Sequence, residues 1–306
     1  MRAHSFSFDA MASACELRVV AADAATAERA AQAAIAEVRR VEATYSRYQP
    51  ASVVSRINAN AGGNWVACDD ETLTLLAYAE TLFNASGGLF DITSGILRQA
   101  WNFREARVAD PAQLAQLCAR IGWQQLERDG RQVRLPRAGM EIDFGGFGKE
   151  YAADRAAAAL LTQGIERGYV NLAGDVHVLG PKPDGQPWGI GIQHPRDPCK
   201  IIATIPVHQG GLATSGDYER YFEQDGKRYC HILNPHTGMP VNHWQSVSVL
   251  ATTALTAGSL STIAMLKEAD GLAFLDQTGA VYLALDAQGQ AHRRDFRDRA
   301  AGQSAR

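Results

Sequence analysis

The pattern of hydrophobic residues changes near the middle of this 306-residue chain, and the change limits the folds open to it. Residues Ala24 to Thr44 and Glu71 to Asn84 place apolar side chains at helical spacing, with Ser86-Gly87-Gly88 as a stop after the second helix. From Gly168 onward the chain carries short β-like runs separated by glycine and proline. This mixture predicts an α+β (mixed α/β) fold with mixed or antiparallel sheets flanked by helices.

Other segments predict further elements. A strand over Cys15 to Ala21 leads into the first helix, which gives a βα opening. Asp110 and Pro111 suit the cap and first turn of a short helix that ends at Arg120. The remaining expected elements are a helix near Ala254 to Lys267 and strands over Tyr169 to Leu179, Trp188 to Gln193, Ile201 to Val207, Tyr229 to Leu233, Ser246 to Ala251 and Ala280 to Leu285.

Length and composition predict one folded domain. The chain is 46% hydrophobic, which is ample for a buried core, and Trp101, Trp123 and Trp188 are expected in that core. No repeat or low-complexity linker divides the sequence. We expect a single domain over residues 1–287, with room for two subdomains that meet near the middle, and a polar tail over residues 288–306 that frays after about Asp298.

Charge and cysteine content exclude several classes of protein. A net charge of −3 and a pI near 6.2 argue against a generally basic nucleic-acid-binding surface. The five cysteines form no Cys-x-x-Cys pair and are odd in number, so neither a disulfide framework nor a zinc site is expected. The amino terminus lacks the apolar run of a signal peptide, and no segment reaches membrane-spanning length without charge. These features predict a soluble, cytoplasmic protein without membrane insertion and without a nucleic-acid partner.

A glycine-rich stretch, Asp143 to Asp154, carries the strongest single sign of ligand binding. An alternating segment over Val133 to Asp143 predicts the strand that enters it, and Lys149 to Gln163 predicts the helix that follows. Free N–H groups at a helix start attract phosphate, glycine lets a ligand approach the backbone, and a lysine adds a full positive charge. The stretch is neither a Walker A loop nor Gly-x-Gly-x-x-Gly, so a plain tight connection remains the alternative interpretation.

The second half of the chain holds further polar segments. Leu172-Ala173-Gly174-Asp175 lies between two β-like runs, where Gly174 marks either a tight turn or a place where a flat ligand meets backbone. Hydroxyls, turn residues and two histidines are dense from Ala213 to Tyr218 and from His231 to Pro240. His231 stands where a strand meets a turn and is either a structural hydrogen bonder or a functional group, whereas His236 is expected to be exposed.

Seven short segments follow one another in order between about Phe8 and Leu285. They are Met11-Ala-Ser, Tyr45-Ser-Arg-Tyr with Ser52 to Asn58, Gly88 to Thr93 with Trp101-Asn-Phe103, Asp143 to Asp154, Asn171 to Asp175, Thr214 to Tyr218, and His231 to Pro240. Together they resemble the FAD:protein FMN transferases, the ApbE family of flavin transferases. The resemblance covers nearly the whole chain and implies an ApbE-like fold with the active site in a cleft between subdomains.

The resemblance implies a Mg²⁺-dependent enzyme that cleaves FAD, attaches FMN by a phosphoester to a threonine or serine of an acceptor flavoprotein or redox subunit, and releases AMP. The acceptor would carry a Ser/Thr-Gly-Ala-Thr/Ser-like sequence. Lys149 and His231 are the expected catalytic residues, with Lys149 offsetting negative charge and His231 acting as a base or orienting the phosphate. The expected flavin-binding residues are Met11, Phe90, Asp91, Thr93, Asp143, Lys149, Gly174, Ser215 and Ile232.

One departure from the family pattern concerns the metal. Family members carry an Asp-Ala-Leu-Ala-Thr-like segment whose aspartate and threonine bind the metal together with a main-chain oxygen of the glycine-rich loop. Here Thr262 and the loop residue Gly146 are retained, but Gly258 stands in place of the aspartate. Mg²⁺ is usually held by one or two carboxylates, so three outcomes are open. The metal is held through FAD phosphates, another oxygen donor such as Ser261 or Asp217 replaces the aspartate, or the protein binds flavin without efficient transfer. Hydrolysis of FAD to FMN and AMP is a further alternative.

Overall fold

In the computed structural model, residues 1–295 are described, and an eight-stranded sheet forms their centre. The neighbouring strands of this sheet pair antiparallel throughout. In spatial order the strands are β1 (Arg2–Ala10), β2 (Ser13–Ala21), β6 (Gly168–Leu172), β7 (Asp175–Gly180), β10 (Gly210–Gly216), β13 (Trp244–Ala251), β14 (Val281–Asp286) and β15 (Ala291–Arg294). The sheet thus joins the amino-terminal strands to the carboxyl-terminal ones.

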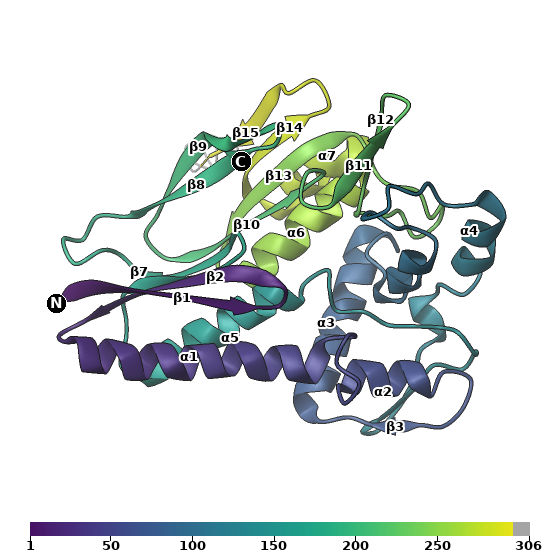
Figure 1. The fold of residues 1–306 in the computed structure, drawn as a ribbon, viewed down its shortest axis with the longest axis horizontal. Coiled ribbons are helices and arrows are strands. Elements are labelled where there is room, and N and C mark those ends of the chain that lie inside the picture. Colours follow the sequence, from purple (N-terminus) through teal and green to yellow (C-terminus); the bar gives the residue numbers. More distant parts are fainter. Residues whose placement is uncertain (296–306) are drawn as a thin grey trace, which may run out of the picture.

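Helices cover one face of the sheet, where α1 and α5 run side by side and α6 packs across β10 and β13 (Figure 1). Apolar residues of the sheet and of these helices form one large core, which includes Leu17, Ala34, Ala156, Val249 and Ile263. The α-helices are α1 (Ala24–Tyr45), α2 (Val53–Ala59), α3 (Asp70–Ser86), α4 (Pro111–Cys118), α5 (Gly148–Thr162), α6 (Ala254–Leu266) and α7 (Gly271–Thr278). Short 3₁₀ helices are η1 (Ile92–Gln99), η2 (Trp123–Gln125) and η3 (Glu268–Asp270).

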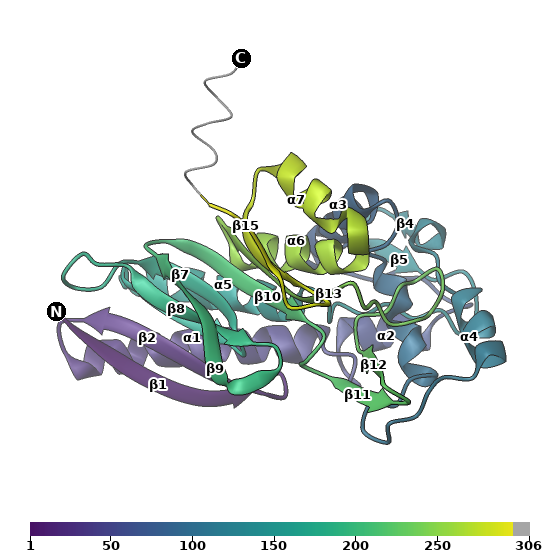
Figure 2. The same ribbon diagram turned by 90° about the horizontal axis from the view of Figure 1, so that it is seen from above.

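Smaller sheets complete the architecture. The hairpin of β8 (Trp188–His194) and β9 (Asp197–Val207) packs Trp188 and Val207 against Val176 and Val178, which point away from the helices. The other small sheets are β3 (Val66–Ala67), β5 (Gln132–Arg134) and β4 (Glu127–Asp129), and the pair β11 (Tyr221–Gln224) and β12 (Lys227–Cys230). Both ribbon views place α2 and α4 beyond one end of the large sheet (Figure 2). There a second core gathers η1, α4 and β11 around Trp101.

The expected helices are confirmed because their end signals operate as the sequence indicates. Asp110 accepts from the Gln113 N–H with Pro111 in the first turn, and Gly87 ends α3 with a left-handed φ of 70°. The tryptophans expected in the core, Trp101, Trp123 and Trp188, are all buried. The α+β class with antiparallel sheets and flanking helices is therefore confirmed. No helix within residues 1–295 combines the length and the apolar character needed to cross a membrane.

Several expected strands are wrong in detail. The chain opens with a hairpin rather than a βα unit, because β1 precedes β2, and Tyr169 to Leu179 is two strands joined at Ala173 and Gly174. The strand expected over Val133 to Asp143 is only Gln132–Arg134, after which Pro136 and a left-handed Gly139 lead into irregular chain. Strand β15 lies inside the tail expected over residues 288–306 because Ala291–Arg294 pair with β14. The expectation of fraying after Asp298 lies outside the described residues.

Candidate active site

The glycine-rich loop leads directly into α5, where the N–H groups of Phe147 and Gly148 donate to the Phe144 carbonyl. No side chain caps this helix, whereas Asp23, Ser52, Asp69, Asp110 and Thr253 cap the starts of α1, α2, α3, α4 and α6. Gly145 and Gly146 are exposed, and the ring of Phe90 lies over Gly146, where an added Cβ would come 2.9 Å from Phe90 Cζ. An exposed glycine loop before an uncapped helix start suits the approach of an anion.

Lys149 forms an ion pair at this helix start. Its Nζ donates to Asp175 Oδ2 at 2.5 Å, and Asp175 is the first residue of β7, directly after the turn at Gly174. The Asp175 side chain is 5% exposed, but that of Lys149 is 36% exposed and therefore open to a ligand. Burial lowers the pKa of Lys149, yet the carboxylates of Asp175 and Glu150 outweigh it and raise that pKa, so the ammonium group stays charged.

Glu150, which the sequence interpretation missed, is a buried carboxylate beside this pair. Burial first, and then the charge of Asp175, raise its pKa to about 8. Its Oε2 is buried and has no hydrogen-bond partner within residues 1–295. The one signal in the sequence is its place on the apolar stripe of α5, three and seven residues before the buried Ala153 and Ala157. An acidic residue on such a stripe is unusual unless it is paired.

The residues expected to bind metal lie on α6 and at the loop. Gly258 and Thr262 are one helical turn apart, and so they share a face of α6. Ser215 Oγ, on β10, lies 2.8 Å from Ser261 Oγ and 2.9 Å from Thr262 Oγ1, while Ser261 donates to the Gly258 carbonyl at 2.9 Å. Ser215 therefore lies with the expected metal site. Within residues 1–295, no three His, Cys, Asp or Glu side chains gather as a metal site, so a cation here would rely largely on hydroxyl and carbonyl oxygens.

Asp91 and Thr93 use their side chains inside the protein. Asp91 Oδ1 accepts from both the N–H and the hydroxyl of Thr93 at 2.7 Å, and Asp91 Oδ2 accepts from the Trp123 N–H at 3.0 Å. Thr93 in turn accepts from the Gly122 N–H at 2.8 Å. These bonds hold η1 against the segment around Trp123. The two residues thus shape the chain beside Phe90, whose ring stacks on Phe147 with centroids 6.3 Å apart.

Asp143 is paired in a way that the sequence did not indicate. Its Oδ2 accepts from Arg47 Nη1 at 2.5 Å, and its Oδ1 accepts from the Gly145 N–H at 3.0 Å. An added Cβ at Gly95 would come 2.5 Å from Asp143 Cβ, so η1 packs closely against the loop. Asp143 therefore fixes the shape of the loop and brings Arg47 to its side.

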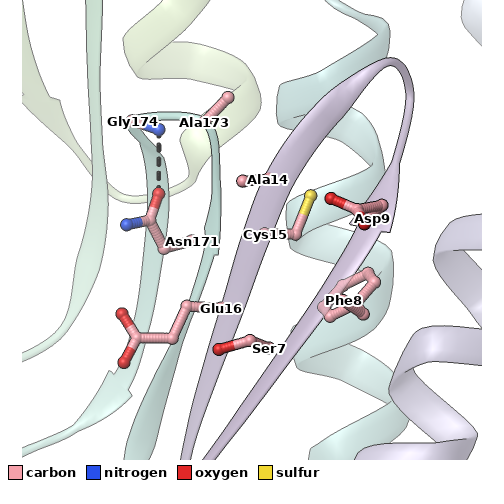
Figure 3. A pocket seen from close by; sticks show the side chains of 9 residues that line it. All are labelled: Ser7, Phe8, Asp9, Ala14, Cys15, Glu16, Asn171, Ala173 and Gly174. Carbon is pink, nitrogen blue, oxygen red and sulfur yellow. Dashed lines mark hydrogen bonds between the residues drawn. The ribbon is translucent and has the colours of Figure 1, made fainter.

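Met11 and Gly174 lie at two turns of the large sheet. Met11 and Ala12, with φ of 53° and 57°, form the two-residue turn between β1 and β2, and the Met11 N–H donates to Glu42 at 2.9 Å. A pocket of about 390 Å³ lies between this hairpin and the β6–β7 turn (Figure 3). Its lining consists of Ser7, Phe8, Asp9, Ala14, Cys15, Glu16, Asn171, Ala173 and Gly174. Of the expected flavin-binding residues, this pocket contains Gly174.

His231 and Ile232 follow β12 directly, where Ile232 is buried. The His231 N–H donates to the Arg220 carbonyl at 3.0 Å, and its Nδ1 is buried without a hydrogen-bond partner in the described part of the chain. Burial, together with the positive charges of Arg220 and Lys149, lowers the pKa of His231 to about 4. The imidazole is therefore neutral at pH 7, and its buried Nδ1 is left without a hydrogen-bond partner among the described residues. His236, by contrast, is exposed as expected.

The lowered pKa of His231 predicts how the stability of the protein changes with pH. Because the pKa falls from its ordinary value of 6.5 to about 4 on folding, the unfolded chain binds more protons between these pH values. The contribution of neutral His231 to the free energy of unfolding is therefore fully present above pH 6.5 and is lost as the pH falls below 6.5. Between pH 7 and pH 5, we expect the free energy of unfolding to fall by about 2 kcal/mol more in the wild type than in His231→Gln. Urea unfolding at both pH values measures this, with His236→Gln at an exposed position as the control. Equal losses in wild type and His231→Gln would contradict it.

Comparisons with known proteins agree with this arrangement. The model of the ApbE family matches residues 11–284. An FAD:protein FMN transferase of Klebsiella pneumoniae is 33% identical over 268 residues, covering 86% of this chain and 82% of the relative. One from Haemophilus influenzae is 31% identical, covering 85% and 80%.

Solved structures show the same fold. The ApbE protein of Thermotoga maritima matches with a TM-score of 0.89 and 31% identity over 96% of this chain and 97% of that one. The apo form of the Pseudomonas stutzeri flavinyl transferase ApbE matches with a TM-score of 0.86 and 29% identity over 97% and 96%. On the family match and this identity across nearly its full length, the chain belongs to the ApbE family.

Proposed function

We propose that this protein is an FAD:protein FMN transferase, which moves FMN from FAD to a threonine or serine of an acceptor flavoprotein. The observation that carries the proposal is the partly exposed side chain of Lys149 beside an exposed glycine loop and a helix start without a side-chain cap. The names of the relatives, as FAD:protein FMN transferases, support the same reaction. A Ser/Thr-Gly-Ala-Thr/Ser-like sequence is the proposed recognition element of the acceptor.

The proposed reaction is a phosphoryl transfer. The acceptor hydroxyl oxygen attacks the phosphorus of the FMN phosphate, the P–O bond to the AMP phosphate breaks, and AMP leaves. Lys149 offsets the negative charge of the phosphates, and Asp175 keeps its ammonium in place at 2.5 Å. His231, neutral and with a free Nδ1, takes the hydroxyl proton or orients the phosphate. Phe90, Met11 and Ile232 remain proposed contacts of the flavin.

The residues present fit a magnesium ion. Glu150 has a buried carboxylate oxygen without a partner, and the hydroxyls of Ser215, Ser261 and Thr262 are hard oxygen donors on the neighbouring strand and helix. Together with the Gly146 carbonyl, this is the donor chemistry that Mg²⁺ prefers. When bound, the ion supplies further charge neutralisation for the phosphates.

All five cysteines are free thiols, which supports a reducing compartment such as the cytoplasm.

Product analysis tests the proposed function. The protein is incubated with FAD, Mg²⁺ and an acceptor that carries the recognition sequence, and the acceptor is analysed by mass spectrometry. We expect the acceptor to gain the mass of FMN while AMP appears in equal amount. A matched acceptor with alanine at the modified threonine or serine should stay unlabelled. Free FMN and AMP without labelled acceptor would instead identify hydrolysis, and bound FAD without products would identify a flavin-binding protein.

A further inference from the structure

The space beside Gly258 is filled by the side chain of Glu150. An added Cβ at position 258 would come 2.5 Å from Glu150 Cγ and 2.7 Å from Glu150 Cδ, and would overlap Oε1 as well. Helices α5 and α6 pack against each other at this point. A carboxylate carried by α5 therefore occupies the space that a side chain on α6 would otherwise enter.

The Glu150 carboxylate lacks a cation of its own. The nearby Lys149 already donates to Asp175, and Oε2 of Glu150 is buried with no hydrogen-bond partner in residues 1–295. The surroundings are acidic, because the carboxylates of Asp175 and Asp154 act on Glu150 and that of Glu219 acts on Lys149. A buried carboxylate is costly unless it is paired or binds a metal. The site therefore favours an additional positive charge.

Oxygen donors lie on the loop before α5 and on α6, the two segments that meet at Glu150 and Gly258. Gly146 is four residues before Glu150 on the loop that begins α5, and Thr262 is one turn beyond Gly258 on α6. Ser215 contacts Thr262, and Ser261 contacts both Ser215 and the Gly258 carbonyl. We propose that Glu150 supplies, from α5, the metal-binding carboxylate that position 258 on α6 lacks, and that it holds Mg²⁺ together with Thr262 and the Gly146 carbonyl. This inference rests on the proposed function, which requires Mg²⁺ at this place.

Metal binding by Glu150 is tested without turnover. The full-length protein is titrated with Mn²⁺ alone, followed by electron paramagnetic resonance, and its melting temperature is measured with and without Mg²⁺. We expect Glu150→Gln, which keeps the shape and removes the charge, to weaken Mn²⁺ binding at least tenfold and to abolish stabilisation by Mg²⁺. Glu219→Gln, which removes an exposed carboxylate whose charge acts on Lys149, is the matched control and should bind Mn²⁺ within about twofold of wild type.

A swap variant keeps the inference testable if Glu150→Gln folds poorly. In the double variant Glu150→Ala with Gly258→Asp, the first substitution removes the carboxylate that α5 carries, and the second adds one on α6 in the space left open. Mn²⁺ affinity should then recover to within a few fold of wild type. Equal Mn²⁺ binding by wild type and folded Glu150→Gln, including no binding by either, overturns the inference, as does a folded swap variant without Mn²⁺ binding. If binding depends on Glu150 but the acceptor gains no FMN, the metal site stands and the proposed function fails.

Discussion

Lys149→Met is expected to lower the rate of FMN transfer at least ~10²-fold, because the charge that faces the phosphates disappears. The substitution also leaves the buried carboxylate of Asp175 without its partner at 2.5 Å. Because only Asp175 is fully buried in this pair, leaving its carboxylate without a partner costs about 1–3 kcal/mol. The transfer rate is measured on the acceptor protein by mass spectrometry, and the melting temperature is measured alongside. Lys200→Met, which removes an exposed ammonium on β9, is the control for charge and should change neither value appreciably.

A second variant separates the two effects of Lys149. Asp175→Asn replaces the buried carboxylate with a neutral side chain of the same shape, so Lys149→Met with Asp175→Asn should regain most of the lost stability. If the ammonium acts on the substrate, the double variant stays at least ~10²-fold slow even though it is folded. Recovery of the transfer rate in the double variant would instead show that Lys149 serves only as the partner of Asp175.

Helices could be predicted from the sequence because their signals are local. The periodicity of Ala24–Tyr45 and the cap at Asp110 depend on residues within a few positions of each other. The alternation of apolar and polar residues after Val133 is misleading. Leu135, Met140 and Ile142 are buried, but they lie in irregular chain after the end of β5. Alternating burial therefore indicates a strand only when the backbone also finds a pairing partner, and the sequence does not show that partner.

The candidate site also has a part that can be predicted from the sequence and a part that cannot. Lys149, the glycine loop and His231 stand out as residue types at the end of an element, so the sequence is enough to name them as candidates. Their partners depend on contacts between distant segments, such as Arg47 with Asp143 and Glu150 with Gly258, which are 96 and 108 positions apart. A resemblance to the family also does not reveal that the side chains of Asp91 and Thr93 form hydrogen bonds within the protein.

Gly258→Asp is expected to destabilise the protein rather than to restore a lost metal ligand. Position 258 is buried, and the new Cβ would meet the Cγ and Cδ atoms of Glu150 at 2.5 and 2.7 Å. Overpacking of this kind costs about 1–3 kcal/mol, and burial of a second carboxyl group beside Glu150, whose pKa is already raised to about 8, disfavours the ionised form of the new group. We therefore expect the free energy of unfolding to fall by at least about 3 kcal/mol, measured by urea denaturation at pH 7.

Two further variants assign this loss to its cause. Gly258→Ala adds only the Cβ, so it should destabilise less than Gly258→Asp because it buries no further carboxyl group. Glu150→Ala combined with Gly258→Asp removes the obstacle, and most of the stability lost in Gly258→Asp should return. Contact between the two positions means that their effects are not additive, and the interaction energy from this double-mutant cycle should favour the combined variant by ~1–3 kcal/mol. Additive effects would show that Glu150 does not occupy the space beside Gly258, and the assignment of the carboxylate to α5 would then be wrong.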